Sequence, residues 1–226
     1  MFPPDHDIPG VKICGFKDPA QVTAVAALGP QAIGINLWPQ SKRYMPLATA
    51  QAHLQPIAQT QHLIAVLVNA DAALIDAAHA SGLFRSLQLH GDETPELVAT
   101  LMALGIHIIK ALQVRDTASI DQIGQYPCRD ILLDAWNPGL YGGGGHAFPW
   151  ELAIEAAQRF PEKRIILSGG LSPDNVAVAI ARTHPAAVDV ASGVESAPGI
   201  KDLALVSRFL AQARPSGSVA ANASEP

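Results

Sequence analysis

Three short apolar runs of this sequence carry, at their ends, side chains that can move a proton. Cys14 ends the run VKIC, His90 ends SLQLH, and Asp134 lies next to the end of DILLDA. If these runs are strands with their isoleucines and leucines facing outward, the thiol, the imidazole and the carboxylate all face inward. Such a group is suited to general acid–base catalysis, provided that the three runs end at the same place.

Each of these residues also has an ordinary structural interpretation. A single cysteine on a strand is often a small buried hydrophobe, and an aspartate at a strand end often caps a helix or forms a turn. His90 could be a hydrogen-bonded structural residue. The fold that positions the three side chains must therefore decide between these interpretations.

The chain alternates between β-branched, apolar runs and segments with helix signals. Three helix caps each precede a closing glycine by eleven residues, namely Asp18 and Gly29, Asp71 and Gly82, and Thr94 and Gly105. Alternating strands and helices indicate a parallel sheet. An open doubly wound sheet is the alternative, but no GxGxxG motif follows the first run. The eight runs therefore predict a single-domain (β/α)8 TIM barrel of the α/β class; they lie at 11–16, 32–37, 62–69, 86–91, 107–114, 130–135, 164–170 and 187–194.

The ends of the chain are expected to lie outside this barrel. We assign residues 1–10 to an N-terminal extension, 11–211 to the catalytic domain, and 212–226 to a disordered tail, because the tail is rich in small and polar residues and has no apolar period.

In a barrel of this kind the carboxyl ends of all strands meet at one face, which carries the active site. The three runs above would therefore aim Cys14, His90 and Asp134 at one mouth. Long loops follow the second and the sixth run, and long loops in compact domains are often functional. The first contains Arg43, which could bind a carboxylate with two parallel hydrogen bonds or could be an ordinary surface arginine. The second contains GGGG at 142–145, a candidate lid.

The last two runs end in glycines that suggest a phosphate site. SGG at 168–170 precedes LSPDN, where we expect a helix with Ser172 as its cap, and the eighth run ends in ASGVE. Backbone N–H groups after the seventh and eighth strands of such barrels commonly bind phosphate, since glycine lets the backbone approach the ligand. The alternative is that these glycines only form tight turns.

Composition excludes several classes of protein. The formal charge is −5 and the 15 lysines and arginines form no basic cluster, which disfavours nucleic-acid binding. No apolar run approaches the roughly 18 residues of a membrane span. Cys14 and Cys128 form no zinc motif, and a chain of this size needs no disulfide. We therefore expect a cytoplasmic protein with no membrane association and no metal.

Taken together, the motifs resemble the phosphoribosylanthranilate isomerase family of tryptophan biosynthesis. The resemblance extends in order from about Val11 to Asp202, through VKICG, AIGINLWPQSKRY, LQLHGDE, ILLDA, ILSGGLSPDNV and VDVASGVESAPGIKD. It implies a (β/α)8 enzyme that is a monomer or homodimer. It also implies an Amadori rearrangement of the small-molecule substrate N-(5-phosphoribosyl)anthranilate to 1-(2-carboxyphenylamino)-1-deoxyribulose 5-phosphate, with no cofactor or metal.

The resemblance also implies roles for individual residues. The general base falls on Cys14, the general acid on Asp134, and the contact to the anthranilate carboxylate on Arg43. Further substrate contacts fall on the backbone of the glycine-rich turns, at Gly169, Gly170, Ser192 and Gly193, and Asp189 has a supporting position. From the strand register we also expect His90, which would face the same mouth, to contact the substrate. A thiol with a pKa near ~8.5 supplies only a few per cent of thiolate at pH 7, and Lys12 is a candidate for lowering the pKa of Cys14.

The sixth loop departs from the family pattern. His146, Ala147 and Pro149 stand where family members commonly have Lys, Thr and Asp. Two neighbouring phosphate-binding barrels are rival interpretations, indole-3-glycerol-phosphate synthase and a bifunctional sugar-phosphate isomerase of histidine biosynthesis, but the set of Cys14, Asp134 and Arg43 argues against them. A barrel that binds a phosphorylated ligand without turnover is the non-enzymatic alternative.

Overall fold

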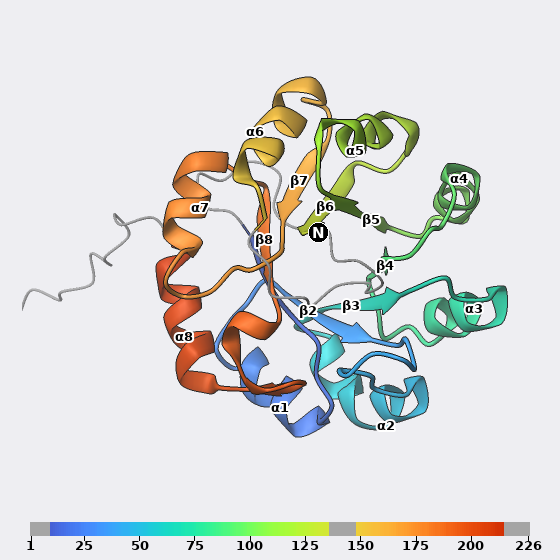
Figure 1. Ribbon diagram of the computed structural model, residues 1–226. Helices are drawn as coiled ribbons and strands as arrows, with labels where there is room; N and C mark the ends of the chain where they lie inside the picture. Colours follow the sequence, from blue (N-terminus) through green and yellow to red (C-terminus); the bar gives the residue numbers. More distant parts are fainter. Residues whose placement is uncertain (1–9, 136–147, 215–226) are drawn as a thin grey trace, which may run out of the picture.

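The structure, a computed structural model, describes residues 10–135 and 148–214. Eight parallel strands pair in sequence order and close into a barrel, with helices around the outside (Figure 1), so the prediction of a single-domain (β/α)8 barrel is confirmed. Each strand falls within one of the eight runs or begins one residue before it. The strands are β1 Gly10–Cys14, β2 Ala32–Asn36, β3 His62–Leu67, β4 Ser86–Leu89, β5 Ile108–Val114, β6 Asp130–Ala135, β7 Arg164–Leu167 and β8 Ala187–Val190.

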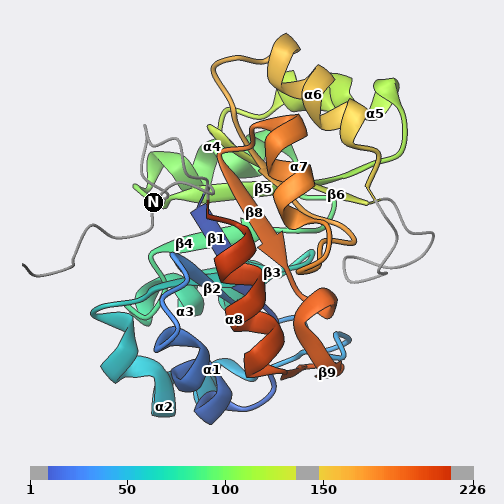
Figure 2. The same cartoon turned by 90° about the vertical axis from the view of Figure 1, so that its left-hand side faces the viewer.

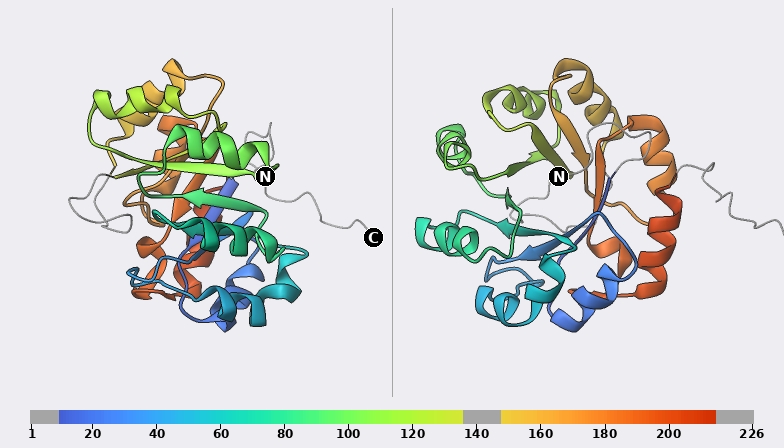
Figure 3. Two further views of the ribbon diagram at one scale, coloured as in Figure 1. Left: turned by 90° about the vertical axis from the view of Figure 1, so that its right-hand side faces the viewer. Right: turned by 180° about the vertical axis from the view of Figure 1, so that it is seen from behind.

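Helices connect the strands on the outer face, which Figure 3 shows from two further sides. They are α1 Pro19–Ala26, α2 Leu47–Ala58, α3 Ala72–Ala80, α4 Pro95–Ala103, α5 Thr117–Asp121, α6 Trp150–Arg159, α7 Val176–Thr183 and α8 Leu203–Gln212, with short 3-10 helices η1 Gln122–Gln125 and η2 Ser192–Val194. Among the described residues no helix is long and apolar enough to cross a membrane.

α8 extends one residue beyond the expected domain end at 211. The lid glycines 142–145, His146, Ala147 and most of the expected extension and tail lie outside the described residues.

The predicted caps open three of the helices. The side chains of Asp18, Asp71 and Thr94 accept hydrogen bonds from backbone N–H groups in the first turns of α1, α3 and α4. Each helix is followed by its expected glycine in a left-handed conformation, with φ between 64° and 80°. Local sequence therefore fixes where these helices begin and end.

The predicted start of α7 is wrong. The helix begins at Val176 with Asn175 as its N-cap, three residues later than a cap at Ser172 would require. The side chain of Asn175 explains the delay, because its Oδ1 accepts from the backbone N–H of Ser172 at 2.8 Å and its Nδ2 donates to the carbonyl of Gly170 at 2.9 Å. These two bonds hold residues 170–175 in a turn before the helix starts.

The barrel has two apolar layers. Small and branched residues fill its interior, including Leu132 and Ala111, whereas Ile131 and Leu133 pack in the larger layer between the strands and the helices. The strands therefore alternate as predicted, and the polar position Asp134 continues the inward side of β6.

A short hairpin follows β8 and precedes α8. Strand β9, Glu195–Ala197, pairs antiparallel with β10, Ile200–Lys201. Figure 2 shows β9 beyond the end of β8 and near the first turns of α8. The backbone N–H of Lys17, in the loop after β1, donates to the carbonyl of Gly199 at 3.3 Å. The hairpin is thus attached to the loop between β1 and α1.

A directional chain of hydrogen bonds crosses the amino-terminal ends of four strands. His62 Nε2 lies 2.8 Å from Ser86 Oγ, which lies 2.8 Å from His107 Nδ1, and His107 Nε2 lies 2.8 Å from Asp130 Oδ2. With Asp130 ionised, each donor points toward that carboxylate, and neutral His62 with its proton on Nε2 begins the chain. Burial lowers the pKa of His62 from 6.5 to about 4.

The lowered pKa of His62 predicts a loss of stability in acid. The folded state favours the neutral ring, so this contribution is complete above about pH 6.5, falls as the pH decreases and is lost near pH 4. For a partly exposed ring, screened by solvent, it amounts to about 1–2 kcal/mol. Urea unfolding of a His62→Gln variant should therefore show a shallower decrease of stability between these pH values. His79→Gln, on the exposed face of α3, should keep the wild-type slope, and an unchanged slope for His62→Gln would contradict the assignment.

Candidate active site

The structure brings five of the predicted site residues to one mouth. Cys14, Arg43, His90, Asp134 and Asp189 all line a cavity of about 60 Å³ at the carboxyl ends of the strands. They come from β1, the loop after β2, the end of β4, β6 and β8. Residues separated by up to 175 positions in the sequence therefore share one small space, as expected for a barrel active site.

Cys14 ends β1 with its thiol against a glycine and a lysine. A Cβ atom added to Gly34 on β2 would lie 2.8 Å from Cys14 Sγ and 2.9 Å from Lys12 Nζ, so both side chains use the space that Gly34 leaves. The ammonium of Lys12, which is fully buried, donates to Asp189 Oδ1 at 2.8 Å. Ser168 Oγ donates to the other carboxylate oxygen of Asp189 at 3.4 Å. The Cys14 thiol, the Lys12 ammonium and the Asp189 carboxylate thus lie next to one another at the mouth.

The electrostatic balance at Cys14 differs from the simplest expectation. Burial raises the pKa of the thiol, and the charge of Asp189 acts in the same direction. Lys12 lowers it as expected, and Lys201 lowers it too, but burial outweighs both and the net pKa lies above its ordinary value. Burial alone would lower the pKa of Lys12, but Asp189 and Cys14 raise it, so the ammonium stays charged. A raised pKa favours the protonated thiol near neutral pH, beside a cation that can stabilise the thiolate.

Asp134 is held by a histidine. Its Oδ2 lies 3.3 Å from His90 Nε2, and its Oδ1 accepts from the backbone N–H of Ala135 at 3.0 Å. His90 Nδ1 lies 2.7 Å from the amide nitrogen of Gln88, which is fully buried. With that amide donating to Nδ1, the ring carries its proton on Nε2 and donates it to Asp134. His90 is therefore hydrogen-bonded, as its structural interpretation expected, and it also lines the mouth cavity.

Arg43 is not an ordinary surface arginine. Its side chain is 13% exposed, and its Nε and Nη2 atoms donate to the two carboxylate oxygens of Glu195 at 2.8 and 2.7 Å. The stem of Arg43 crosses Gly15, where an added Cβ would lie only 2.3 Å from Arg43 Cδ. Gly15 also has a φ of 84°, a conformation that favours glycine. The glycine after the candidate base thus makes room for the arginine.

The glycines of the predicted phosphate site bring two loops together. A Cβ on Gly193 would lie 1.9 Å from the carbonyl oxygen of Leu171, and Gly169 and Gly170 have φ values of 86° and 68°. These glycines therefore do form tight turns, as the alternative interpretation expects. Within residues 10–135 and 148–214, the backbone N–H groups of Gly169, Gly170, Ser192 and Gly193 donate no hydrogen bond to the protein. The phosphate interpretation of these turns stays a prediction, supported by four backbone donors that no described residue occupies.

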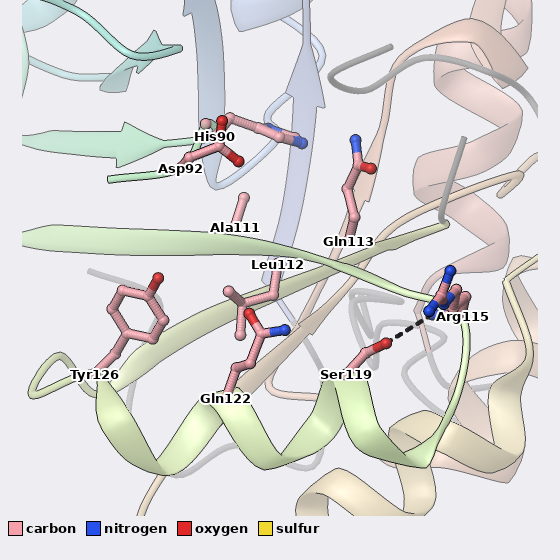
Figure 4. Close-up of a pocket in the computed structure, with 10 residues that line it drawn as sticks. His90, Asp92, Ala111, Leu112, Gln113, Arg115, Ser119, Gln122 and Tyr126 are labelled. Carbon is pink, nitrogen blue, oxygen red and sulfur yellow. Dashed lines mark hydrogen bonds between the residues drawn. The ribbon is translucent and has the colours of Figure 1, made fainter. Parts of the chain in front are cut away.

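A larger cavity adjoins the mouth. It has a volume of about 410 Å³ and lies between the ends of β4 and β5 and the segment that contains α5 (Figure 4). In Figure 4 the polar side chains of Ser119 and Gln122 extend from the α5 segment toward β5, whereas Gln113 extends from the opposite side of β5. His90 lines both cavities, so they meet at this side chain.

Two side chains of the site were not singled out from the sequence. Glu195 pairs with Arg43, and Lys201 Nζ donates to Glu195 Oε1 at 2.8 Å and to the carbonyl of Cys14 at 2.6 Å. The available signal was the Pro-Gly turn in ESAPGIK, with a glutamate on one side and a lysine on the other. Pro-Gly marks a turn, and a turn can bring the residues on its two sides together. Among the described residues no group of three or more His, Cys, Asp or Glu side chains could hold a metal ion.

Known proteins with similar sequences identify the family of this chain. A family model described as N-(5'phosphoribosyl)anthranilate (PRA) isomerase matches residues 11–212. N-(5'-phosphoribosyl)anthranilate isomerase from Acinetobacter calcoaceticus is 41% identical over 206 residues, which cover 88% of this chain and 93% of that protein. The protein of the same name from Trichlorobacter lovleyi is 37% identical over 204 residues, or 90% and 97% of the two chains.

Solved structures lead to the same family. The crystal structure of phosphoribosyl anthranilate isomerase from Thermotoga maritima has a TM-score of 0.81 and 33% identity, and the match covers 91% of this chain and 98% of that one. A structure of the enzyme in complex with reduced 1-(o-carboxyphenylamino)-1-deoxyribulose 5-phosphate has a TM-score of 0.76, with 31% identity and the same coverage. This chain therefore belongs to the N-(5'-phosphoribosyl)anthranilate isomerase family of enzymes.

Proposed function

We propose that Cys14 and Asp134 are the general base and the general acid of this enzyme, whose reaction is the isomerisation of N-(5'-phosphoribosyl)anthranilate in tryptophan biosynthesis. The observation that carries the proposal is their arrangement at the mouth. Both line the same cavity, one beside a buried cation and the other in contact with a histidine. The chemistry has two proton transfers, and the site offers one group for each.

Asp134 acts first, as the acid. Its proton passes to the ring oxygen of the ribose, the bond between that oxygen and C1′ breaks, and the nitrogen lone pair forms a C=N bond to C1′. The product of this step is an open-chain Schiff base with a positive charge on nitrogen. His90, at 3.3 Å, holds the carboxylate in place as the proton leaves.

Cys14 acts second, as the base. Its thiolate takes the proton from C2′, and the electron pair of that C–H bond moves toward the positive nitrogen to give an enolamine. Tautomerisation of the enolamine yields the C2′ ketone. Lys12 stabilises the thiolate by its charge, and Asp189 holds Lys12 in place. Burial keeps the pKa of the thiol above its ordinary value, so we infer that the thiolate forms as the substrate binds.

The two ends of the substrate are anionic, and we propose a separate contact for each. Arg43 binds the anthranilate carboxylate, and the backbone donors of Gly169, Gly170, Ser192 and Gly193 bind the phosphate. The mouth cavity of about 60 Å³ is smaller than the ~300–1,000 Å³ of typical ligand pockets. The substrate therefore extends beyond this cavity, which Arg43 lines, toward the glycine-rich turns.

An Arg43→Ala variant should bind substrate more weakly. Loss of a charged, doubly hydrogen-bonded contact should raise KM about tenfold or more, with a smaller effect on kcat because the reacting carbons are distant from the carboxylate. Steady-state kinetics would show this split. Lys42→Ala removes the adjacent exposed cation and should leave KM close to the wild-type value. An unchanged KM for Arg43→Ala would exclude the carboxylate contact.

Growth provides the direct test of the activity. Expression of this chain in a tryptophan auxotroph that lacks the isomerase should restore growth without tryptophan. Purified protein should convert the substrate to the ketose product, which chromatography separates. Binding of the substrate without conversion, together with failure to complement, would favour a barrel that binds a phosphorylated ligand without turnover.

We also propose a cytoplasmic enzyme that is a monomer or a homodimer. The two cysteines are free and buried, which suits a reducing compartment. One solved relative is described as mutually generated monomers of the dimeric isomerase from Thermotoga maritima, which supports keeping both states in the proposal. Light scattering on the purified protein would distinguish the two.

A further inference from the structure

The β9–β10 hairpin contains a buried ion pair that the proposed proton transfers do not use. Glu195 Oε1 and Lys201 Nζ are 2.8 Å apart, and their side chains are 5% and 0% exposed. Burying two charges is costly unless hydrogen bonds satisfy both of them. The groups that form hydrogen bonds with Glu195 and Lys201 therefore indicate which parts of the site this ion pair holds in place.

Glu195 holds Arg43. Its two oxygens accept from Nε and Nη2 of Arg43, from Lys201, and from the backbone N–H of Gly199 at 3.1 Å. Burial alone would raise the pKa of Glu195, but the hydrogen bonds from Arg43 and the charge of Lys201 keep it below its ordinary value. Glu195 is thus an ionised acceptor whose hydrogen bonds are directed at the guanidinium.

This pairing leaves one edge of the guanidinium for a ligand. An arginine has five N–H donors, and the bond to Glu195 uses the edge formed by Nε and Nη2. The remaining donors on Nη1 and Nη2 form a second edge that can bind another carboxylate in the same way. Since Arg43 lines the mouth cavity, Glu195 orients this second edge for the substrate.

Lys201 joins the end of β1 to the residue that follows β8. Its ammonium donates to the carbonyl of Cys14 at 2.6 Å and to the carbonyl of Ala191 at 3.1 Å, besides Glu195, and it lies 5.1 Å from the centre of the Phe16 ring. Cys14 is the last residue of β1, and Ala191 directly precedes the Ser192–Gly193 turn. One ammonium thus fixes the backbone of the base and the start of a candidate phosphate loop.

We propose that Glu195 and Lys201 are positioning residues for the isomerisation, with Glu195 orienting Arg43 toward the substrate carboxylate and Lys201 fixing the backbone of Cys14 and Ala191. The proposal rests on the functions proposed above for Arg43 and Cys14. A competing possibility has the opposite consequence: if Glu195 only occupies Arg43 in the absence of ligand, its removal strengthens binding of the substrate.

A Glu195→Gln variant distinguishes the two possibilities. Glutamine has the same length but only one neutral oxygen, so Arg43 loses its two-point acceptor. We expect KM to rise about tenfold to a hundredfold while kcat changes less than threefold. An unchanged or lower KM would overturn the positioning role of Glu195. A KM effect without loss of thermal stability separates positioning from a general loss of structure.

Binding in the absence of turnover makes the test independent of catalysis. The probes are reduced 1-(o-carboxyphenylamino)-1-deoxyribulose 5-phosphate and the same compound without its carboxyl group, measured by calorimetry. Wild-type protein should prefer the first ligand, and Glu195→Gln should lose most of this preference while binding the second ligand as before. Equal affinity of the wild type for both would refute the proposed role of Arg43 itself. An undiminished preference in Glu195→Gln would refute only the positioning.

Lys201→Met tests the second half of the proposal. Methionine preserves the stem but removes the ammonium, so kcat should fall at least tenfold, because the Cys14 backbone loses its anchor and the thiol loses a nearby positive charge. Lys163→Met is the matched control, since Lys163 Nζ also donates to two carbonyls, those of Tyr126 and Cys128, near the start of β6. That control should lose stability without losing kcat. Equal kcat for Lys201→Met and Lys163→Met would overturn the role of Lys201. If Lys201→Met does not fold, Lys201→Arg replaces it in the test. Arginine has the same charge in a different shape, so it should lower kcat by displacing the Cys14 backbone, and a wild-type kcat for Lys201→Arg would overturn the role.

Discussion

Replacing Cys14 by serine should lower kcat by about 10²–10⁴-fold, the range that a positioned base contributes. Serine fits the same buried space beside Gly34, but its hydroxyl is a far weaker acid than a thiol, so Lys12 cannot generate the base from it. Circular dichroism and thermal unfolding should remain close to wild type. The reaction would be followed by chromatography of substrate and product at saturating substrate concentration.

The other cysteine of the chain provides the control. Cys128 is buried before β6, with its Sγ 3.7 Å from the carbonyl of Asp130, and lies outside the mouth. Cys128→Ser should keep wild-type kcat. Because burial raises the pKa of Cys14, the thiolate fraction of the free enzyme increases as the pH rises from about 7 to about 9, and wild-type kcat/KM should increase with it over the range in which the general acid keeps its proton. A Cys14→Ser variant that retains more than a tenth of wild-type kcat would exclude the thiol as the base.

The barrel could be predicted because each of its units is specified locally. β-branched runs such as HLIAVL form the strands, and caps such as Asp71 with its closing Gly82 limit the helices. Repetition of the unit eight times then leaves few topologies. The prediction of the start of α7 was wrong because two local signals compete there. Ser172 and Pro173 look like a helix start, but the side chain of Asn175 closes a competing turn first.

The position of the candidate catalytic groups followed from the alternation of the strands. Once Ile131 and Leu133 face the helices, Asp134 cannot do so, and the same reasoning applies to Cys14 beside Ile13. The rule uses only neighbouring residues, and it therefore succeeds from sequence alone.

Contacts between distant segments could not be predicted in this way. Arg43 and Glu195 are 152 residues apart, and nothing in SKRY or SGVES specifies that they meet. The net pKa of Cys14 is a sum of burial and several charges, and the sequence near Cys14 contains only the contribution of Lys12. Long-range pairing and burial are properties of the closed barrel, and the structure was needed to find them.

Replacing Asp134 by asparagine should also lower kcat by about 10²–10⁴-fold, with KM within a few-fold of wild type. The amide has nearly the same shape, and its oxygen can still accept from the N–H of Ala135, so the fold and the binding of substrate should persist. It has no proton to give to the ring oxygen, and ring opening becomes rate-limiting. Measuring kcat and KM, with calorimetric binding of the reduced product analogue, separates lost chemistry from lost binding.

Two further variants show whether the proton comes from Asp134 or from the histidine beside it. Asp92→Asn removes an exposed carboxylate two residues after His90 and should not change kcat. His90→Asn removes the ring that contacts Asp134 Oδ2, and it should cost less than Asp134→Asn because the carboxyl group remains. If His90→Asn instead loses as much kcat as Asp134→Asn, and the double variant loses no more, the two act as one unit. Asp134 would then orient His90, which would be the acid that opens the ring.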